Sequence, residues 1–299
     1  MDKLRRRESD AAASNGTKSA PDPLLRIENL VVEYRTADRR KPPLRVLHEV
    51  SLDVRPHETV GLVGESGSGK TTLGRAVLGL VPVASGTIAF DGSRIDGLAR
   101  RARRALSRDI QVIFQDPYGS LNPSMTIGDI LTEPLTAGRT HSRAAARARI
   151  GELLDAVGLP ADTADRLARE LSGGQRQRVA IARALAPGPR LIICDEPVSA
   201  LDLSTRAQVL NLLVELQQRT GVAYLFIAHD LSVVGHVSDR VAVMSKGAIV
   251  ECASARRITT EPAHPYTRNL LLAAPVPDPA RQADRRAARH RLAREGAAR

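Results

Sequence analysis

The sequence predicts an α/β protein whose core is a parallel β-sheet covered by helices. Short apolar runs with the composition of buried strands occupy residues 60–63, 191–194 and 222–228. A helical pattern follows the first two runs, at residues 70–80 and 205–218. Continuous apolar strands that alternate with helices are typical of parallel sheets, because helices bury both faces of such a sheet. The 299 residues suffice for one large domain of this kind.

A second group of strands is expected nearer the N-terminus. Residues 30–34 and 50–54 have strand composition, the second with clear alternation of apolar and polar positions. Residues 86–90 add a short strand before the Asp91-Gly92 turn. We expect these segments to form an antiparallel β subdomain beside the parallel core.

A helical insertion is expected after a short strand at residues 111–114. Its clearest helical patterns are residues 143–157 and 173–185. We interpret residues 117–188 as a helical subdomain inserted into the sheet. No internal repeat is apparent, which indicates one unit of this kind rather than two fused ones.

The composition is that of a globular protein without a membrane span. Hydrophobic residues make up 42% of the chain and charged residues 26%. The apolar runs are far shorter than the roughly 20 residues that cross a bilayer, and the start of the chain shows neither a secretory signal nor a lipid anchor. The two cysteines, Cys194 and Cys252, fit a reducing compartment. We therefore expect a cytoplasmic protein without a disulfide or a cysteine-rich metal cluster.

Both ends of the chain are expected to be disordered. Residues 1–24 are rich in Ala, Ser, Asp and Arg without periodicity. The formal net charge is +11, and much of the excess comes from arginines in residues 281–299. A basic tail could meet nucleic acid or anionic lipid, but 2% aromatic residues and no tryptophan leave no stacking residues for single strands. We favour a solvated tail and expect no nucleic-acid partner.

The strand at residues 60–63 runs directly into a loop with the pattern G-x-x-x-x-G-K-[ST]. Its glycines let the backbone curl so that successive N–H groups and the start of the next helix face phosphate groups. Lys70 would reach the β and γ phosphates of ATP, and the Thr71 hydroxyl would bind Mg²⁺. The strand-to-helix setting favours this phosphate-binding loop (P-loop) over an ordinary glycine-rich turn. The predicted nucleotide-binding residues are Gly64, Glu65, Ser66, Gly67, Ser68, Gly69, Lys70, Thr71 and Thr72.

Two carboxylates end the apolar run at residues 191–194. A buried parallel strand would deliver Asp195 and Glu196 to the carboxyl edge of the sheet, where open α/β sheets bind ligands. Alone, such a pair is more often a solvated strand end. Downstream of a P-loop, Asp195 is a candidate to hold Mg²⁺ through water, and Glu196 is a candidate to polarise the attacking water.

A second phosphate-binding helix start is expected at residues 171–178, which read Leu-Ser-Gly-Gly-Gln-Arg-Gln-Arg before an apolar helical pattern. Ser172 is well suited to cap that helix. Gly173 and Gly174 would leave its first N–H groups exposed, where the helix dipole favours an anion.

A P-loop, then LSGGQ, then an apolar strand ending in Asp-Glu resembles the ATP-binding-cassette (ABC) family, over about residues 25–255. The resemblance implies a P-loop NTPase (RecA-like) parallel core with an antiparallel β subdomain, an inserted helical subdomain and a short C-terminal extension. It places the ABC ATPase domain at residues 25–257, the extension at 258–280 and a basic tail at 281–299.

The same resemblance implies that two cassettes meet head to tail. Residues Ser172, Gly173, Gly174 and Gln175 would then clasp the γ-phosphate of ATP held by the partner's P-loop, and the segment 199–202, which includes Asp202, would carry communication across the dimer.

Three single residues take roles from the resemblance. Tyr34 would stack on adenine, Gln115 would sense Mg²⁺ and the attacking water, and His229 would hold the γ-phosphate and water. A strand tyrosine usually packs in the core and a lone histidine is usually structural. These assignments therefore depend on the spacing of the residues relative to the three motifs.

Residues 115–123 and 194–202 look like the dipeptide/oligopeptide importer group of the family, especially its second, F-type ATPase subunit, and residues 262–279 resemble that group's C-terminal extension. The resemblance implies ATP-driven import of dipeptides, oligopeptides or a related small solute from the cytoplasmic face of the membrane. It implies a related D-type cassette as partner, two transmembrane permease subunits and, indirectly, an extracytoplasmic solute-binding protein. Relatives also move nickel, glutathione or oligosaccharides, so the cargo stays open.

Two departures from the group matter. His57 stands where the group has glycine, on a turn that we expect to be exposed. The extension lacks the cysteine cluster of some relatives, so we expect no iron–sulfur centre.

Two other functional classes compete with import. A soluble cassette ATPase acting on DNA or ribosomes is suggested by LSGGQ together with the arginine-rich tail, but such proteins generally need a coiled-coil insertion, zinc-binding cysteines or tandem cassettes. Salt-sensitive nucleic-acid binding that stimulates ATP hydrolysis would favour it. An export ATPase is argued against by the importer-like extension.

Overall fold

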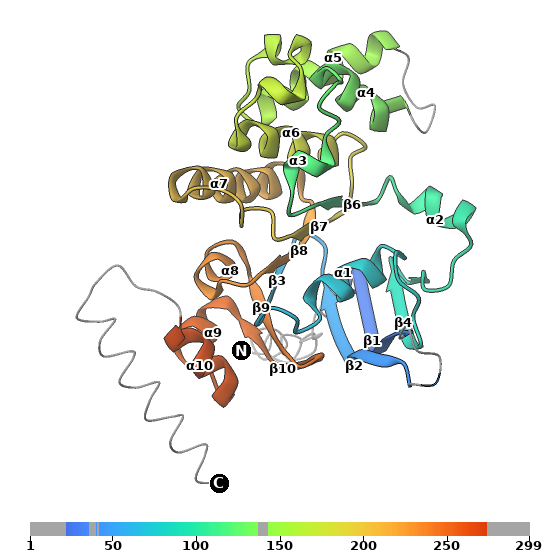
Figure 1. The fold of residues 1–299 in the computed structure, drawn as a ribbon, viewed down its shortest axis with the longest axis vertical. Coiled ribbons are helices and arrows are strands. Elements are labelled where there is room, and N and C mark those ends of the chain that lie inside the picture. Colours follow the sequence, from blue (N-terminus) through green and yellow to red (C-terminus); the bar gives the residue numbers. More distant parts are fainter. Residues whose placement is uncertain (1–21, 36–39, 41, 137–142, 274–299) are drawn as a thin grey trace, which may run out of the picture.

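The computed structural model describes residues 22–35, 40, 42–136 and 143–273. Most of the expected N-terminal leader, the end of the extension and the whole basic tail lie outside this range. Figure 1 shows a mixed sheet at the centre, a helical part at one end and an antiparallel sheet beside α1. No helix in the described ranges is long and apolar enough to cross a membrane.

The central sheet has six described strands in the order β10-β9-β3-β8-β7-β6. Neighbouring strands from β9 to β6 are parallel, and β10 is an antiparallel edge strand. The strands are β3 (Thr59–Val63), β6 (Ile110–Ile113), β7 (Leu191–Asp195), β8 (Ala223–Ala228), β9 (Arg240–Ser245) and β10 (Ala248–Ser254). The parallel core expected from the apolar runs is confirmed.

Alternate residues of each central strand face opposite sides of the sheet. In β8, Leu225 and Ile227 pack with α1 and the antiparallel sheet, whereas Tyr224 and Phe226 pack with the helices of the other side. In β7 the same alternation sends Ile193 to the first core and Cys194 to the second. Two hydrophobic cores therefore share one sheet, which is why its strands read as continuous apolar runs.

The second sheet is antiparallel, with the order β2-β1-β4-β5, as expected for the N-terminal strands. Its strands are β1 (Leu25–Tyr34), β2 (Leu44–Val54), β4 (Ser85–Phe90) and β5 (Ser93–Arg94). It covers α1 (Lys70–Val77) on the side away from the central sheet, and Leu73, Ala76 and Val77 fill the space between.

The segment between β6 and β7 contains helices and no described strand. It holds α3 (Pro117–Ser120), α4 (Ile127–Thr136), α5 (Arg143–Ala156), the short 3-10 turns Ala161–Asp165 and Ala168–Glu170, and α6 (Gly173–Leu185). The helical character expected for residues 117–188 is present, and α6 has the predicted bounds. Helix α7 (Leu203–Thr220) follows β7 and packs on α6.

The C-terminal part of the described chain was only partly anticipated. The hairpin of β9 and β10 was not among the expected strands, although it completes the central sheet. Helices α8 (Leu231–Val237), α9 (Ala255–Thr260) and α10 (Pro265–Ala273) lie on one side of it. The predicted extension therefore begins within a part of the chain that already packs on the cassette, because Ile258 is buried and Leu270 and Leu271 contact the same core.

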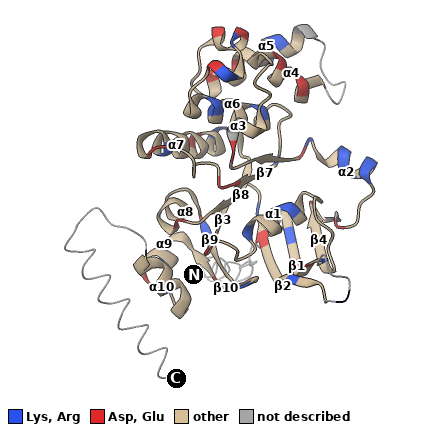
Figure 2. Cartoon of the chain, viewed as in Figure 1, with Lys and Arg blue, Asp and Glu red and all other residues tan. Residues whose placement is uncertain are grey.

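Positive charge is also concentrated outside the tail. Helix α2 (Arg100–Leu106) has the sequence RRARRAL, and Figure 2 shows its basic residues at one edge of the molecule. Arg103 is partly buried and donates to the carbonyls of Val77 and Ile95 at 2.9 and 2.6 Å. The excess of positive charge is thus shared between the tail and this helix.

His57 is exposed, as expected, but its backbone is left-handed, with a φ of 61°. Glycine adopts this conformation without a Cβ penalty, so His57 carries a backbone cost that the glycine implied by the resemblance would avoid.

Replacing Phe226 by Ala should destabilise the fold by about 3–5 kcal/mol, because it removes a large buried side chain and leaves a cavity. Phe226 is 1% exposed. Chemical denaturation of the full chain measures the change. Leu80→Ala is the control: Leu80 is 61% exposed, so this truncation should change the free energy of unfolding by less than about 0.5 kcal/mol. Equal effects of the two truncations would contradict the assigned core.

Candidate functional site

The P-loop curls between β3 and α1 in a shape that needs glycine. Gly67 and Gly69 have φ values of 79° and 105°, a region open to glycine but costly for other residues. A Cβ on Gly64 would lie 2.1 Å from the carbonyl oxygen of Met244 in β9. The loop therefore passes too close to the neighbouring strand for any side chain at this position.

Lys70 is buried at the first position of α1 and turns back over the loop. Its Nζ donates to the carbonyl oxygens of Gly64 and Glu65, each at 2.9 Å. Burial lowers the pKa of Lys70, and the charges of Glu196 and Asp195 oppose this shift. The ammonium group is thus held over the loop. From this position it can donate to a phosphate oxygen in place of one of the two carbonyl oxygens.

The next residue of α1 contacts the end of β7. Thr71 Oγ1 donates to Asp195 Oδ1 at 3.0 Å. The two meet because Val63 pairs with Ala228 and Ile227 pairs with Asp195, so β3, β8 and β7 end at the same edge. Burial raises the pKa of the Asp195 carboxyl, and the bond from Thr71 partly offsets this.

Glu196 lies in a strained turn directly after β7. Its φ of 49° is left-handed, which costs a non-glycine residue about 1–3 kcal/mol unless the surroundings fix it. The Glu196 N–H donates to the Ile227 carbonyl at 3.0 Å, and the Ser199 hydroxyl donates to the Glu196 carbonyl at 3.0 Å. These bonds hold the turn that carries the carboxylate.

Two further predicted residues meet the Glu196 carboxylate. Gln115 Nε2 donates to Glu196 Oε2 at 3.3 Å, and His229 Nδ1 lies 3.3 Å from the same oxygen. Gln115 follows β6 and His229 follows β8, so residues after three neighbouring strands surround one carboxylate. Such an arrangement can orient a water molecule for attack.

Tyr34 ends β1 and is partly buried against the core around α1. Two positions before it, Val32 pairs with Leu47, and a Cβ on Gly69 would lie 2.8 Å from Leu47 Cδ2. The end of β1 therefore lies on the sheet that touches the second half of the P-loop.

The remaining predicted residues form a second cluster at the starts of α6 and α7. Ser172 caps α6: its hydroxyl accepts from the Gln175 N–H at 3.3 Å, and the Gln175 side chain accepts from the Ser172 N–H at 3.0 Å. A Cβ on Gly174 would lie 2.5 Å from Cγ2 of Thr205, so the absence of a side chain lets the two helix starts pack closely.

Asp202 belongs to this second cluster as the cap of α7. Its carboxylate accepts from the N–H groups of Thr205 and Ser204 at 3.0 and 3.1 Å. The hydrogen bonds from Thr205, and then those from Ser204, hold the pKa of Asp202 below its usual range. Ser172 and Asp202 are both exposed, so these helix starts face solvent.

The P-loop, together with Gln115, Asp195, Glu196 and His229, forms the first cluster. This cluster fits a triphosphate with a divalent cation. Backbone N–H groups and Lys70 supply donors, while the Thr71 hydroxyl, the Asp195 carboxylate and the Gln115 amide oxygen are the hard ligands that Mg²⁺ takes alongside phosphate oxygens. In the described part of the chain, the buried hydroxyl of Ser68 has no hydrogen-bond partner. A phosphate oxygen in the loop would supply the missing acceptor.

The other predicted P-loop residues lie around these phosphate-binding groups. Glu65, Ser66 and Gly67 are exposed, and Thr72 is partly buried in the first turn of α1. The Ser68 carbonyl accepts from the Gly247 N–H, in the turn between β9 and β10, at 3.0 Å. The hydroxyl of Tyr266 in α10 also reaches the loop. Neither contact was anticipated, because neither residue belongs to a motif that carries chemistry on its own.

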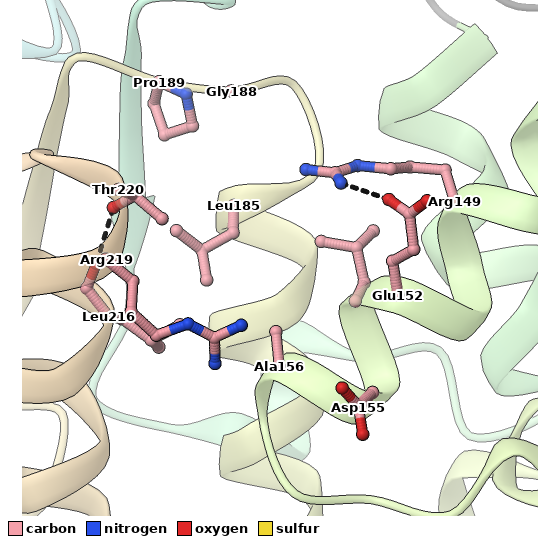
Figure 3. A pocket seen from close by; sticks show the side chains of 11 residues that line it. Arg149, Glu152, Asp155, Ala156, Leu185, Gly188, Pro189, Leu216, Arg219 and Thr220 are labelled. Atoms are coloured by element: carbon pink, nitrogen blue, oxygen red, sulfur yellow. Dashed lines mark hydrogen bonds and ion pairs between the residues drawn. The ribbon is translucent and has the colours of Figure 1, made fainter.

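A separate pocket lies between α5, α6 and α7 (Figure 3). It is a cavity of about 510 Å³ with Glu152, Leu185 and Arg219 among its lining residues. None of the predicted site residues lines it. The phosphate-binding groups are therefore at the sheet edge and not in this cavity.

Replacing Asp195 by Asn should stabilise the chain without nucleotide near neutral pH. Its raised pKa means that the ionised carboxylate opposes folding above the folded-state pKa. This penalty disappears as pH falls below the unfolded value of about 3.9. Thermal unfolding should give the variant the higher midpoint near neutral pH and a shrinking difference towards about pH 4.

The control for this prediction is Asp91→Asn. The Arg190 guanidinium donates to Asp91 and lowers the pKa of that carboxyl, so the wild-type pair contributes stability above the unfolded pKa and the variant should have a slightly lower midpoint. A lower midpoint for Asp195→Asn near neutral pH would contradict the burial penalty.

Solved structures with the same fold are ATP-binding cassettes. CbiO1 of Clostridium perfringens, part of an ABC transporter complex, aligns with a TM-score of 0.71 and 28% identity over 80% of this chain and 92% of its own. The cassette MJ0796, in a dimeric post-hydrolysis state bound to ADP and Pi, aligns with a TM-score of 0.69 and 29% identity over 78% of this chain and 99% of its own. The P-loop NTPase fold expected from the sequence is confirmed.

Curated relatives include the glutathione import ATP-binding protein GsiA of Escherichia coli K12 and that of Shigella boydii, each 51% identical over 269 residues. The match covers 89% of this chain and 43% of each relative, so the chain spans less than half the length of these proteins. The oligopeptide/dipeptide transporter C-terminal region matches residues 250–297, and the ABC transporter family matches residues 47–199. The chain therefore belongs to the ABC transporter family and carries the C-terminal region of oligopeptide and dipeptide transporters.

Proposed function

We propose that this chain is the ATP-hydrolysing subunit of an ABC importer for dipeptides, oligopeptides or a related small solute. The observation that carries the proposal is the meeting of Lys70, Thr71, Asp195 and Glu196 at one sheet edge. Its cargo class is supported by the C-terminal region matched at residues 250–297 and by relatives named for glutathione import. Glutathione is a small peptide, which agrees with that region.

The first cluster is the proposed ATP site. The loop N–H groups and the start of α1 hold the phosphates, because the helix dipole and the exposed donors favour anions. Lys70 Nζ turns from the Glu65 carbonyl to the β and γ phosphates, and Tyr34 stacks on adenine. Burial of Lys70 strengthens its attraction for the phosphate charge, since the surrounding dielectric is low.

We assign Mg²⁺ to Thr71, Gln115 and Asp195, with Asp195 acting through water. The ion would neutralise the charge that builds on the phosphates during transfer. The Thr71 hydroxyl oxygen would bind the ion through a lone pair, and its O–H can still donate to the Asp195 carboxylate. A cation at this point would also favour the ionised form of Asp195, whose pKa is raised by burial.

Glu196 is the proposed residue that polarises the attacking water. The strained turn fixes the position of its carboxylate, and Gln115 and His229 both contact the same oxygen, Oε2. Phosphoryl transfer depends mainly on positioning and charge stabilisation. Gln115 and His229 therefore act by fixing the carboxylate and, with ATP bound, the water and the γ-phosphate.

The second cluster is the proposed surface that contacts ATP bound to a partner cassette. The capped and exposed start of α6, with Ser172, Gly173, Gly174 and Gln175, would bind the γ-phosphate of ATP on another cassette. Asp202 would carry the signal across the dimer from the start of α7. The dimeric state named for MJ0796 supports the pairing of two cassettes, and the partner that we propose is a related D-type cassette.

The assembled importer would contain two transmembrane permease subunits and, indirectly, an extracytoplasmic solute-binding protein. This chain would then lie at the cytoplasmic face of the membrane as a peripheral subunit. Gln115 and the helical segment that follows it would transmit closure of the cassette dimer to the permeases.

Glu196→Gln should lower steady-state ATP turnover at least about 100-fold, because the amide cannot act as a general base, and should leave ATP binding intact. Turnover is measured in the reconstituted complex and binding by titration calorimetry. Glu152→Gln, in the separate pocket, is the matched control and should keep wild-type turnover. An unimpaired rate for Glu196→Gln would rule out its role.

Lys70→Ala should weaken ATP binding to the full chain, since it removes the charged Nζ donor that lies over the loop. Calorimetric titration of MgATP measures the affinity, and circular dichroism checks that the fold is retained. Arg100→Ala, on exposed α2, removes a positive charge away from the loop and should leave the affinity unchanged. An unchanged affinity for Lys70→Ala would count against the P-loop assignment.

A further inference from the structure

The C-terminal region of the chain touches the P-loop through one tyrosine. The Glu65 N–H donates to the Tyr266 hydroxyl oxygen at 3.1 Å, although the two residues are 201 positions apart. Tyr266 lies in the first turn of α10 and is partly buried against the core that contains α8 and α9. A helix outside the cassette motifs therefore contacts the nucleotide-binding loop directly.

The start of α10 is anchored to β10 by hydrogen bonds. The Glu251 carboxylate in β10 accepts the N–H groups of Ala263 and His264 at 2.7 and 3.0 Å. Burial raises the pKa of Glu251, but the nearby Thr267 side chain and the hydrogen bonds from these two N–H groups outweigh it, so the pKa lies below its usual value. The carboxylate thus stays ionised and fixes the turn before α10.

The same hairpin supports the P-loop from a second side. The turn between β9 and β10 donates the Gly247 N–H to the Ser68 carbonyl at 3.0 Å. Glu65 is held by Tyr266 at its N–H and by Lys70 at its carbonyl. One bond on each half of the loop therefore originates from the turn between β9 and β10 or from the helix that β10 anchors.

We propose that Tyr266 is a positioning residue for ATP, which holds the first half of the P-loop in the shape that receives the phosphates. Tyr266 acts on the loop backbone, through its hydrogen bond to Glu65. It acts by reducing the conformational freedom that the loop must lose on binding, and preorganisation of this kind increases affinity. This role extends the proposed ATP site to the C-terminal region, which then contributes to nucleotide affinity.

The test is Tyr266→Phe in the full chain, which removes only the hydroxyl. A net hydrogen bond of ordinary strength corresponds to a change in affinity of about three- to tenfold. The dissociation constant for MgATP, measured by titration calorimetry, and the KM for ATP should rise by this factor. The kcat at saturating ATP should stay unchanged, because the residues around Glu196 are untouched.

Tyr224→Phe is the matched control. Among the described residues the buried Tyr224 hydroxyl has no hydrogen-bond partner, so its loss should leave the dissociation constant unchanged. A second measurement uses amide hydrogen exchange. Because coupling is reciprocal, MgATP should slow exchange in α10 of the wild-type chain, and this protection should be reduced in Tyr266→Phe.

An unchanged or lower dissociation constant for Tyr266→Phe overturns the proposal, as does protection of α10 that is the same in both proteins. A fall in kcat with no change in KM also overturns it. These outcomes are separable from failure of the ATP site itself, since in that case the wild-type chain would bind no MgATP and Lys70→Ala would have no effect.

Discussion

The hydrogen bond between Thr71 and Asp195 joins the two parts of the chain on which the rest of the site depends. One partner lies in the first turn of α1 and the other ends β7, and β8 lies between β3 and β7. The bond forms only because three parallel strands end in register at one edge of a buried sheet. The turn of Glu196 and the position of His229 follow from the same edge. The apolar faces of the sheet thus determine where the polar groups meet.

The polar groups at this edge are held in states that oppose folding. Lys70 and Asp195 are charged groups whose pKa values are shifted by burial, the Ser68 hydroxyl lacks an acceptor among the described residues, and Glu196 has a left-handed backbone. Each of these features would be relieved or used by a bound triphosphate with a cation. An arrangement that costs stability without ligand and suits one class of ligand is typical of functional sites.

The sequence was most informative where local chemistry decides the structure. The bounds of α6 follow from the cap at Ser172, and the P-loop follows from glycines at positions where the backbone needs them. Contacts that depend on tertiary placement were out of reach. Gly247 and Tyr266 contact the P-loop only because β9 and β10 complete the sheet. The spacing of these residues along the chain does not predict either contact. The turn at His57 was predicted in part. The sequence showed that histidine replaces the expected glycine, but it did not show that the backbone there is left-handed.

The central claim, that the groups at this sheet edge form the ATP site, is tested most directly by a crystal structure of the full chain with a non-hydrolysable ATP analogue and Mg²⁺. We expect the phosphates against Lys70 and the start of α1, with the Thr71 hydroxyl oxygen bound to the metal ion. An analogue bound elsewhere, for example in the cavity beside Glu152, would contradict the account.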